Sequence, residues 1–192
     1  MAEKTSDKPY WQDVQVVSVN KEYPRTSFMT YDNRTDALTG KFEKSNYYQL
    51  LNGTWKFFFA DSYKDLPANI TDPSVSTDSW NDIKVPGNWE VQGHGVAIYT
   101  NHGYEFQPRN PQPPTLPEAN PVGVYRRDID IPADWKERDI YLHLAGAKSG
   151  VYVYINGQEV GYSEDSKNPA EFLINKYVKP GKNVLTLKIF RW

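Results

Sequence analysis

Hydrophobic residues along the chain alternate with polar or aromatic ones in several short runs, which is the pattern of β-strands. The clearest case covers residues 151–155 and 158–162, which flank Asn156-Gly157. An Asn-Gly pair between two alternating runs predicts a β-hairpin with a type I′ turn, whose two central residues adopt positive φ. This segment is the strongest local prediction that the chain offers.

Six further segments carry similar strand signals. They are residues 54–59, 80–85, 122–131, 140–144, 171–174 and 183–190. Turn residues such as Pro86-Gly87 and Pro180-Gly181 lie between them. Helical periodicity never extends beyond two or three turns. Many short strands with intervening turns predict a mainly β protein, an antiparallel β-sandwich of jelly-roll topology. We expect most of its stability to come from packing between the two inner faces.

The N-terminal quarter of the chain has a different character. Residues 10–48 show no sustained period and contain scattered apolar anchors, among them Trp11, Tyr23 and Phe28. These anchors favour an extended arm lying over the domain, with one short helical turn, over a disordered leader. We therefore predict an arm at 1–45, a jelly-roll domain at 46–192, and regular structure beginning at Leu50.

Composition excludes several classes of function. The chain has 192 residues, which suits one domain, and its 15% aromatic content favours β-structure. With a net charge of −2, the chain lacks the excess of positive charge that binding to nucleic acid or an anionic membrane requires. The absence of Cys removes disulfides and thiolate chemistry. No apolar run is long enough to span a membrane, and the first residues lack a hydrophobic signal region, which leaves the cellular compartment open.

Metal and nucleophile motifs are missing from the sequence. His94, His102 and His143 lie far apart in the chain, and nothing resembles a calcium-binding loop. Neither a GxSxG elbow nor a P-loop occurs. Glycoside hydrolysis needs a pair of carboxyl groups, but no spacing singles out a pair among Glu90, Glu105, Glu118, Glu164 and Asp165. We therefore predict no catalytic residue and no metal ligand in this chain.

The irregular stretch 85–121 carries the residues best suited to a ligand. Its side chains include Trp89, Tyr99, Asn101, His102 and Tyr104. Amide and imidazole groups supply donors and acceptors for sugar hydroxyls, and aromatic rings offer a flat face to sugar C–H groups. The alternative is that Trp and Tyr only anchor a long loop. Side-chain chemistry alone leaves these two interpretations open.

Five motifs in order resemble the N-terminal domain of bacterial β-galactosidases of glycoside hydrolase family 2. They are LNGTWKF, VPGNWEVQGHGVAIYTN, NPVGVYRRDIDIP, VYVYINGQEVGYSEDSKNPAEF and NVLTLKIFRW. The resemblance covers almost the whole chain from about Tyr10 to Trp192. It implies a galactose-binding-domain-like jelly roll, known as the sugar-binding domain, which is followed by immunoglobulin-like domains and a (β/α)₈ barrel.

The resemblance also implies where the chemistry lies. The barrel carries the acid/base and nucleophile glutamates of a retaining hydrolysis of terminal β-D-galactosyl residues, so residues 1–192 alone should be inactive. Sodium and magnesium ions of the full enzyme would bind outside this segment, which leaves no cofactor in the chain. Expected partners are a galactoside, the downstream domains and, in the full enzyme, further copies of itself. Nucleic acid and membrane are not expected partners.

Three residues of the irregular stretch are the implied substrate contacts. Asn101 matches a family asparagine that reaches the galactoside. His102 stands where a small apolar residue is familiar, which puts the aglycone preference in doubt, and Tyr104 lies nearby in the sequence. Two other functions stay open: an autonomous carbohydrate-binding module, and a purely structural domain that serves assembly through its arm.

Overall fold

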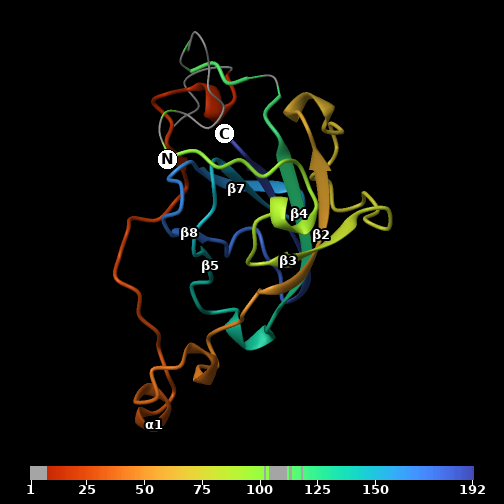
Figure 1. The fold of residues 1–192 in the computed structure, drawn as a ribbon. Helices are drawn as coiled ribbons and strands as arrows, with labels where there is room; N and C mark the ends of the chain where they lie inside the picture. Colours follow the sequence, from red (N-terminus) through yellow and green to blue (C-terminus); the bar gives the residue numbers. More distant parts are fainter. Residues whose placement is uncertain (1–7, 102, 104–111, 113, 118) are drawn as a thin grey trace.

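The fold consists of two antiparallel sheets of very different width (Figure 1). The computed structural model describes residues 8–101, 103, 112, 114–117 and 119–192. The larger sheet has the order β1-β7-β6-β9-β4-β2-β3, and the smaller one pairs β5 with β8. The larger sheet contains β1 (Ser18–Val19), β2 (Gly53–Ala60), β3 (Asn81–Val85), β4 (Val122–Ile131), β6 (Val151–Ile155), β7 (Gln158–Ser163) and β9 (Gly181–Phe190). The smaller sheet contains β5 (Tyr141–Leu144) and β8 (Ala170–Leu173).

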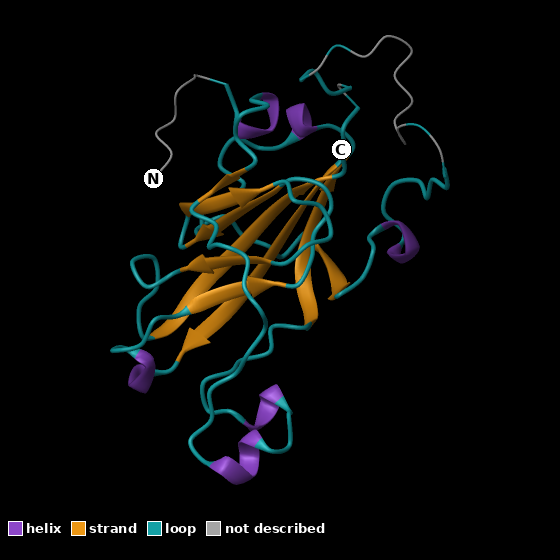
Figure 2. Ribbon diagram, turned by 90° about the vertical axis from the view of Figure 1, so that its left-hand side faces the viewer, coloured by secondary structure: helices purple, strands orange, loops and turns teal. Residues whose placement is uncertain are grey.

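Helices are short and lie in the connections between strands, as Figure 2 shows. They are α1 (Arg34–Ala37) and the 3₁₀ turns η1 (Tyr10–Gln12), η2 (Phe42–Lys44), η3 (Tyr63–Asp65), η4 (Glu90–Gln92) and η5 (Ala133–Trp135). The expected class, a mainly β jelly-roll sandwich with an extended N-terminal arm, is confirmed. Within the described part of the chain, no helix has the length and apolar character needed to cross a membrane.

The predicted β6–β7 hairpin has the expected turn. Asn156 and Gly157 adopt φ values of 52° and 80°, as a type I′ turn requires. Asn156 is fixed further because its Nδ2 donates to Asn183 Oδ1 at 2.9 Å and its Oδ1 accepts from the Val184 nitrogen at 3.0 Å. The side chain therefore joins the hairpin to the neighbouring strand β9.

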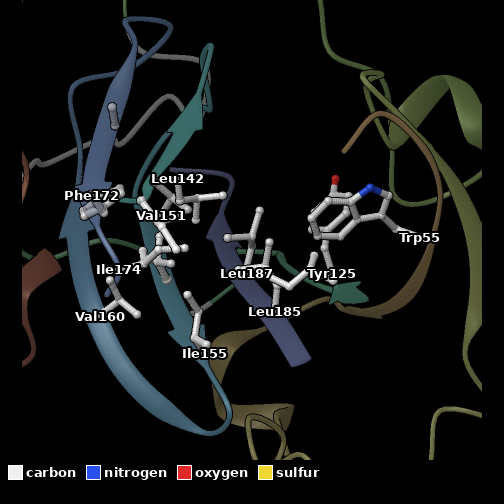
Figure 3. Close-up of a cluster of buried hydrophobic side chains, with 14 of the residues drawn as sticks. Trp55, Tyr125, Leu142, Val151, Ile155, Val160, Phe172, Ile174, Leu185 and Leu187 are labelled. Atoms are coloured by element: carbon white, nitrogen blue, oxygen red, sulfur yellow. The ribbon is translucent and has the colours of Figure 1, made fainter. Parts of the chain in front are cut away.

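The main core lies between the two sheets (Figure 3). Because side chains alternate across a strand, β9 directs Leu185 and Leu187 to this face, where both are buried. The smaller sheet contributes Leu142 and Phe172 from the opposite side. Sheet-on-sheet packing was thus predicted correctly from the period of the strands.

The other face of the larger sheet is also covered, in part by the arm, as the apolar anchors of residues 10–48 predicted. Tyr152 and Tyr162 point to this face and are buried there. Tyr10 of η1 stacks on Tyr152 with ring centroids 5.7 Å apart, and Trp11 lies 5.6 Å from Phe190. The beginning of the arm thus covers part of a second aromatic core.

A buried arginine fixes the loop that covers the rest of this outer face. Arg126 on β4 donates to the carbonyl oxygens of Ile70 and Val75, at 2.6 and 2.8 Å. Its guanidinium also lies 4.9 Å from the ring of Trp80. Burial lowers the pKa of Arg126, since the charge has left bulk water. The Arg126 guanidinium therefore fixes the connection between β2 and β3 on the outer face of the larger sheet.

The arm pairs with the domain before it turns away from it. β1 extends the larger sheet antiparallel to β7, with Ser18 opposite Ser163. Farther along, the Lys21 ammonium lies 2.9 Å from Asp165. The arm then leaves the sandwich, with α1 at its far end (Figure 1). The prediction that regular structure begins at Leu50 was wrong, whereas the division at residue 45 stays a prediction.

Candidate functional site

The irregular stretch begins with a segment that is fastened to the end of β3. Gln92 reaches back to Lys84, with its Oε1 accepting from the Lys84 nitrogen at 2.8 Å and its Nε2 donating to the Lys84 oxygen at 3.0 Å. Gly93 follows with φ of 92°, a left-handed conformation that favours glycine at the end of a helical turn. The chain is thereby turned back over the sheet.

Aromatic contacts hold the next residues against β2. The His94 ring packs edge-on against Phe57 at 4.8 Å. Trp89 is only 5% exposed and lies 6.1 Å from the same phenylalanine. We had grouped Trp89 with the candidate sugar contacts; its burial makes it a core residue instead. Anchoring of the loop, the alternative interpretation, is correct for this tryptophan.

The last two residues of the chain fasten both ends of the stretch. Arg191 donates from Nη2 to the Val96 oxygen at 2.8 Å, and its Nε lies 3.4 Å from Glu90. At the other end, the fully buried Asn120 exchanges two hydrogen bonds with the backbone of Trp192. The stretch 85–121 is therefore a loop with fixed ends.

The described residues that follow Val96 lie largely at the surface. Tyr99 is 91% exposed, Ile98 is 48% exposed, and Asn101 is exposed as well. Of the three implied substrate contacts, Asn101 is the one that lies among the described residues, and it is exposed. His102 and Tyr104 fall outside the described residues. Their roles stay predictions, as does that of Asn101.

The candidate carboxylates that the structure describes already have partners. Glu90 faces Arg191, and Glu164 accepts from the Tyr162 hydroxyl at 2.7 Å. Hydrogen bonds from Asn168 and Lys21 lower the pKa of Asp165, which is a turn role. Glu105 and Glu118 lie outside the described residues. Among the residues that the structure describes, no cluster of acidic or histidine side chains could hold a metal ion.

A cavity of about 690 Å³ lies beside the loop, between the two sheets. Trp55, Tyr125 and Leu187 of the larger sheet contribute to its lining, and so do Leu142 and Leu144 of β5. Figure 3 shows Leu187 lying between Leu142 and Trp55. These side chains belong to segments that the sequence predicted as strands. The sequence pattern could not predict the cavity, because its lining comes from strands and loops that are far apart in the chain.

Comparison with known proteins assigns the family. The family model "Glycosyl hydrolases family 2, sugar binding domain" matches residues 48–192. The chain therefore belongs to glycoside hydrolase family 2 and carries its sugar-binding domain.

Curated relatives extend the match into the arm. A β-galactosidase of Priestia megaterium is 36% identical over 187 residues, which cover 96% of this chain and 18% of that protein. One from Actinobacillus pleuropneumoniae is 37% identical over 183 residues, covering 95% and 17%. The chain thus spans about a sixth of the length of these relatives.

Solved structures agree on the fold. A calcium-binding mutant of Bacteroides uniformis β-glucuronidase 2 aligns with a TM-score of 0.53 at 26% identity, covering 73% of this chain and 14% of its own. Bifidobacterium dentium β-glucuronidase, in complex with coumarin-3-O-glucuronide, gives 0.53 at 24% identity, covering 73% and 19%. Similarity of this degree establishes the architecture and not the sugar that is recognised.

Proposed function

We propose that the chain is the sugar-binding domain of a β-galactosidase that hydrolyses terminal β-D-galactosyl residues by a retaining mechanism. The observation that carries the proposal is the alignment with curated β-galactosidases over 95–96% of the chain, since it includes both the arm and the loop. The relatives are much longer, and in this proposal the catalytic glutamates belong to another part of the polypeptide. In this account the domain forms one wall of the galactoside site and braces a catalytic barrel.

Asn101 is the residue of the loop that would contact the galactoside. Contacts at Glu90–Arg191 and Asn120–Trp192 attach the two ends of the stretch to the sandwich. The Asn101 amide can both donate to and accept from sugar hydroxyls. A contact from a rigid scaffold costs less conformational entropy on binding than one from a free segment. His102 and Tyr104 are proposed to lie near the same sugar, with His102 beside the leaving group.

The proposal predicts that the parent polypeptide acts on β-galactosides in preference to β-glucuronides. The longer parent polypeptide should hydrolyse nitrophenyl β-galactoside with a higher kcat/KM than nitrophenyl β-glucuronide. The 192-residue chain alone should hydrolyse neither substrate. Turnover by the purified chain would refute the assignment of the catalytic groups, and preference for the glucuronide would refute the assignment of the substrate.

A second function is an autonomous carbohydrate-binding module, which the 91% exposed Tyr99 favours because a free ring can stack on a sugar. This reading requires measurable affinity of the isolated chain for lactose or galactose. Isothermal titration calorimetry distinguishes the two functions. A domain that forms only one wall of the galactoside site should bind neither lactose nor galactose on its own, whereas an autonomous module should bind at least one of them.

A further inference from the structure

We propose that Asn52 is a site of spontaneous deamidation, at which the side-chain amide becomes a carboxylate with loss of ammonia. Asn156 is the other asparagine that precedes a glycine, and the fold protects it from the same reaction. This inference concerns residues 1–192 alone. It does not depend on the sugar that the parent enzyme cleaves, so its failure would leave the proposed function untouched.

Deamidation begins with an attack inside the chain. The backbone nitrogen of the following residue loses its proton and attacks the side-chain carbonyl carbon of the asparagine. A C–N bond forms, the bond from Cγ to Nδ2 breaks, and ammonia leaves with the proton. Water then opens the resulting cyclic imide to aspartate or to isoaspartate. A following glycine favours the attack, because it has no Cβ beside its nitrogen and its backbone adopts conformations that other residues avoid.

Asn52 lies where this attack meets little resistance. Its side chain is exposed, and within the described part of the chain no hydrogen bond holds its amide. Gly53 is the first residue of β2 and pairs with Val85. Strand ends open more readily than strand centres, so release of this one pair frees the Gly53 nitrogen. The attack therefore needs only local movement at the end of β2.

Asn156, in contrast, is held by three hydrogen bonds. Its Nδ2 donates to the Tyr177 oxygen at 3.0 Å and to Asn183 Oδ1 at 2.9 Å, while its Oδ1 accepts from the Val184 nitrogen at 3.0 Å. Loss of ammonia would break both bonds from Nδ2. Asn183 is fully buried, so its side chain would lose a partner that water does not readily replace. The hairpin turn is thus shielded, although its sequence is the same Asn-Gly pair.

The product would change the chain where β2 begins. The Leu51 oxygen accepts from Arg127 Nη1 at 2.7 Å, and the Asn52 oxygen accepts from the same nitrogen at 3.0 Å. Isoaspartate adds one methylene to the main chain just before Gly53 and moves the carbonyl oxygen of residue 52. Deamidation at this position therefore acts on the contact between Arg127 and the start of β2.

Mass spectrometry of the aged 192-residue chain tests the proposal. The chain is incubated at neutral pH in water enriched in heavy oxygen, which the opening of the imide incorporates, and is then cut with trypsin. Peptide 45–56 reports on Asn52, which fragment ions separate from Asn46, and peptide 149–167 reports on Asn156. We expect Asn52 to convert about tenfold or more faster than Asn156. In urea, which removes the fold, the two should convert at similar rates.

Two variants check the position and the protection separately. Asn52→Gln should leave residue 52 unconverted, because glutamine forms the corresponding six-membered imide far more slowly. Asn183→Ala removes a partner of Asn156 and should speed conversion of Asn156 in the folded chain; circular dichroism verifies the fold. If Asn183→Ala does not fold, the comparison of the folded and the urea-unfolded chain still decides. The proposal is overturned if Asn52 converts no faster than Asn156 in the folded chain, or if the same difference between the two sites persists in urea.

Discussion

Asn120 and Trp192 exchange two hydrogen bonds: the Asn120 Nδ2 lies 3.2 Å from the Trp192 oxygen, and the Trp192 nitrogen lies 3.0 Å from the Asn120 Oδ1. Asn120 is fully buried immediately before β4, and Trp192 follows β9. One side chain thus fastens the end of the stretch 85–121 to the residue that follows β9.

Removing the clamp should destabilise the domain. Asn120→Ala loses two hydrogen bonds and leaves backbone groups of Trp192 without their partner, so we expect a cost of about 2–3 kcal/mol in the free energy of unfolding. Urea unfolding of the 192-residue chain measures it. Asn81→Ala changes an exposed asparagine and serves as the control, with an expected change within about 0.5 kcal/mol. Equal stability of the two variants would show that the clamp has no energetic role.

The arm should contribute measurable stability through its first turn. Trp11 packs against Tyr63 at 4.9 Å and Phe190 at 5.6 Å. Trp11→Ala should therefore lower the free energy of unfolding by about 2–3 kcal/mol, somewhat less than for a fully buried aromatic. Tyr23, which is 93% exposed in the same arm, provides the control in Tyr23→Ala. A Trp11→Ala variant as stable as the unmodified chain would mean that the arm rests on the sheet without stabilising it.

Arg126 should be irreplaceable by lysine. Its Nη1 and Nη2 reach two different carbonyl oxygens, and its Nε lies 3.2 Å from Thr186 Oγ1. A lysine keeps the charge but loses this planar set of donors. We expect Arg126→Lys to cost about 2–3 kcal/mol and to increase proteolytic cleavage between β2 and β3. Unchanged cleavage would contradict the proposed role in holding that loop.

Alkaline pH should unfold the domain cooperatively. Burial raises the pKa of Tyr152, Tyr154 and Tyr162, with further increases from Glu159 near Tyr154 and Glu164 beside Tyr162. Because these folded-state values exceed the unfolded value of about 10, the stability that they contribute is complete below that pH. It is lost as the pH rises toward the folded values.

Tyrosinate absorbance and circular dichroism, followed together, measure this transition. The three buried phenols should ionise only as the β-sheet signal disappears. Tyr162→Phe should weaken the pH dependence, since it removes one of the buried ionisable groups. Ionisation of all tyrosines in one step near their ordinary pKa, with the sheet intact, would contradict the account.

The sequence predicted the central strands because each is long enough for its period to be read. β4 and β9, with ten residues each, were located to within two residues. The Asn156-Gly157 turn was predictable from local chemistry alone. β1 has only two residues and forms by pairing with β7, so no local pattern marks it.

Side-chain environment was harder to infer than strand position. Trp89 has the chemistry of a sugar platform, yet it lies in the core against Phe57. Only the packing of η4 on β2 and β4 decides between the two roles. The cavity was also beyond sequence reasoning, because loops and strands from distant parts of the chain line it together. Asn101 was identified through family resemblance, and its exposure is compatible with the proposed contact.

The most direct test of the central claim is the kcat/KM of the full parent polypeptide carrying Asn101→Ala, with a nitrophenyl β-galactoside as substrate. Asn69→Ala, an exposed change in the loop over the outer face, is the control. If Asn101 contacts the galactoside, its loss should raise the barrier by about 1–3 kcal/mol, while the control keeps the unmodified rate. Equal kcat/KM for the Asn101→Ala variant and the unmodified enzyme would contradict the account.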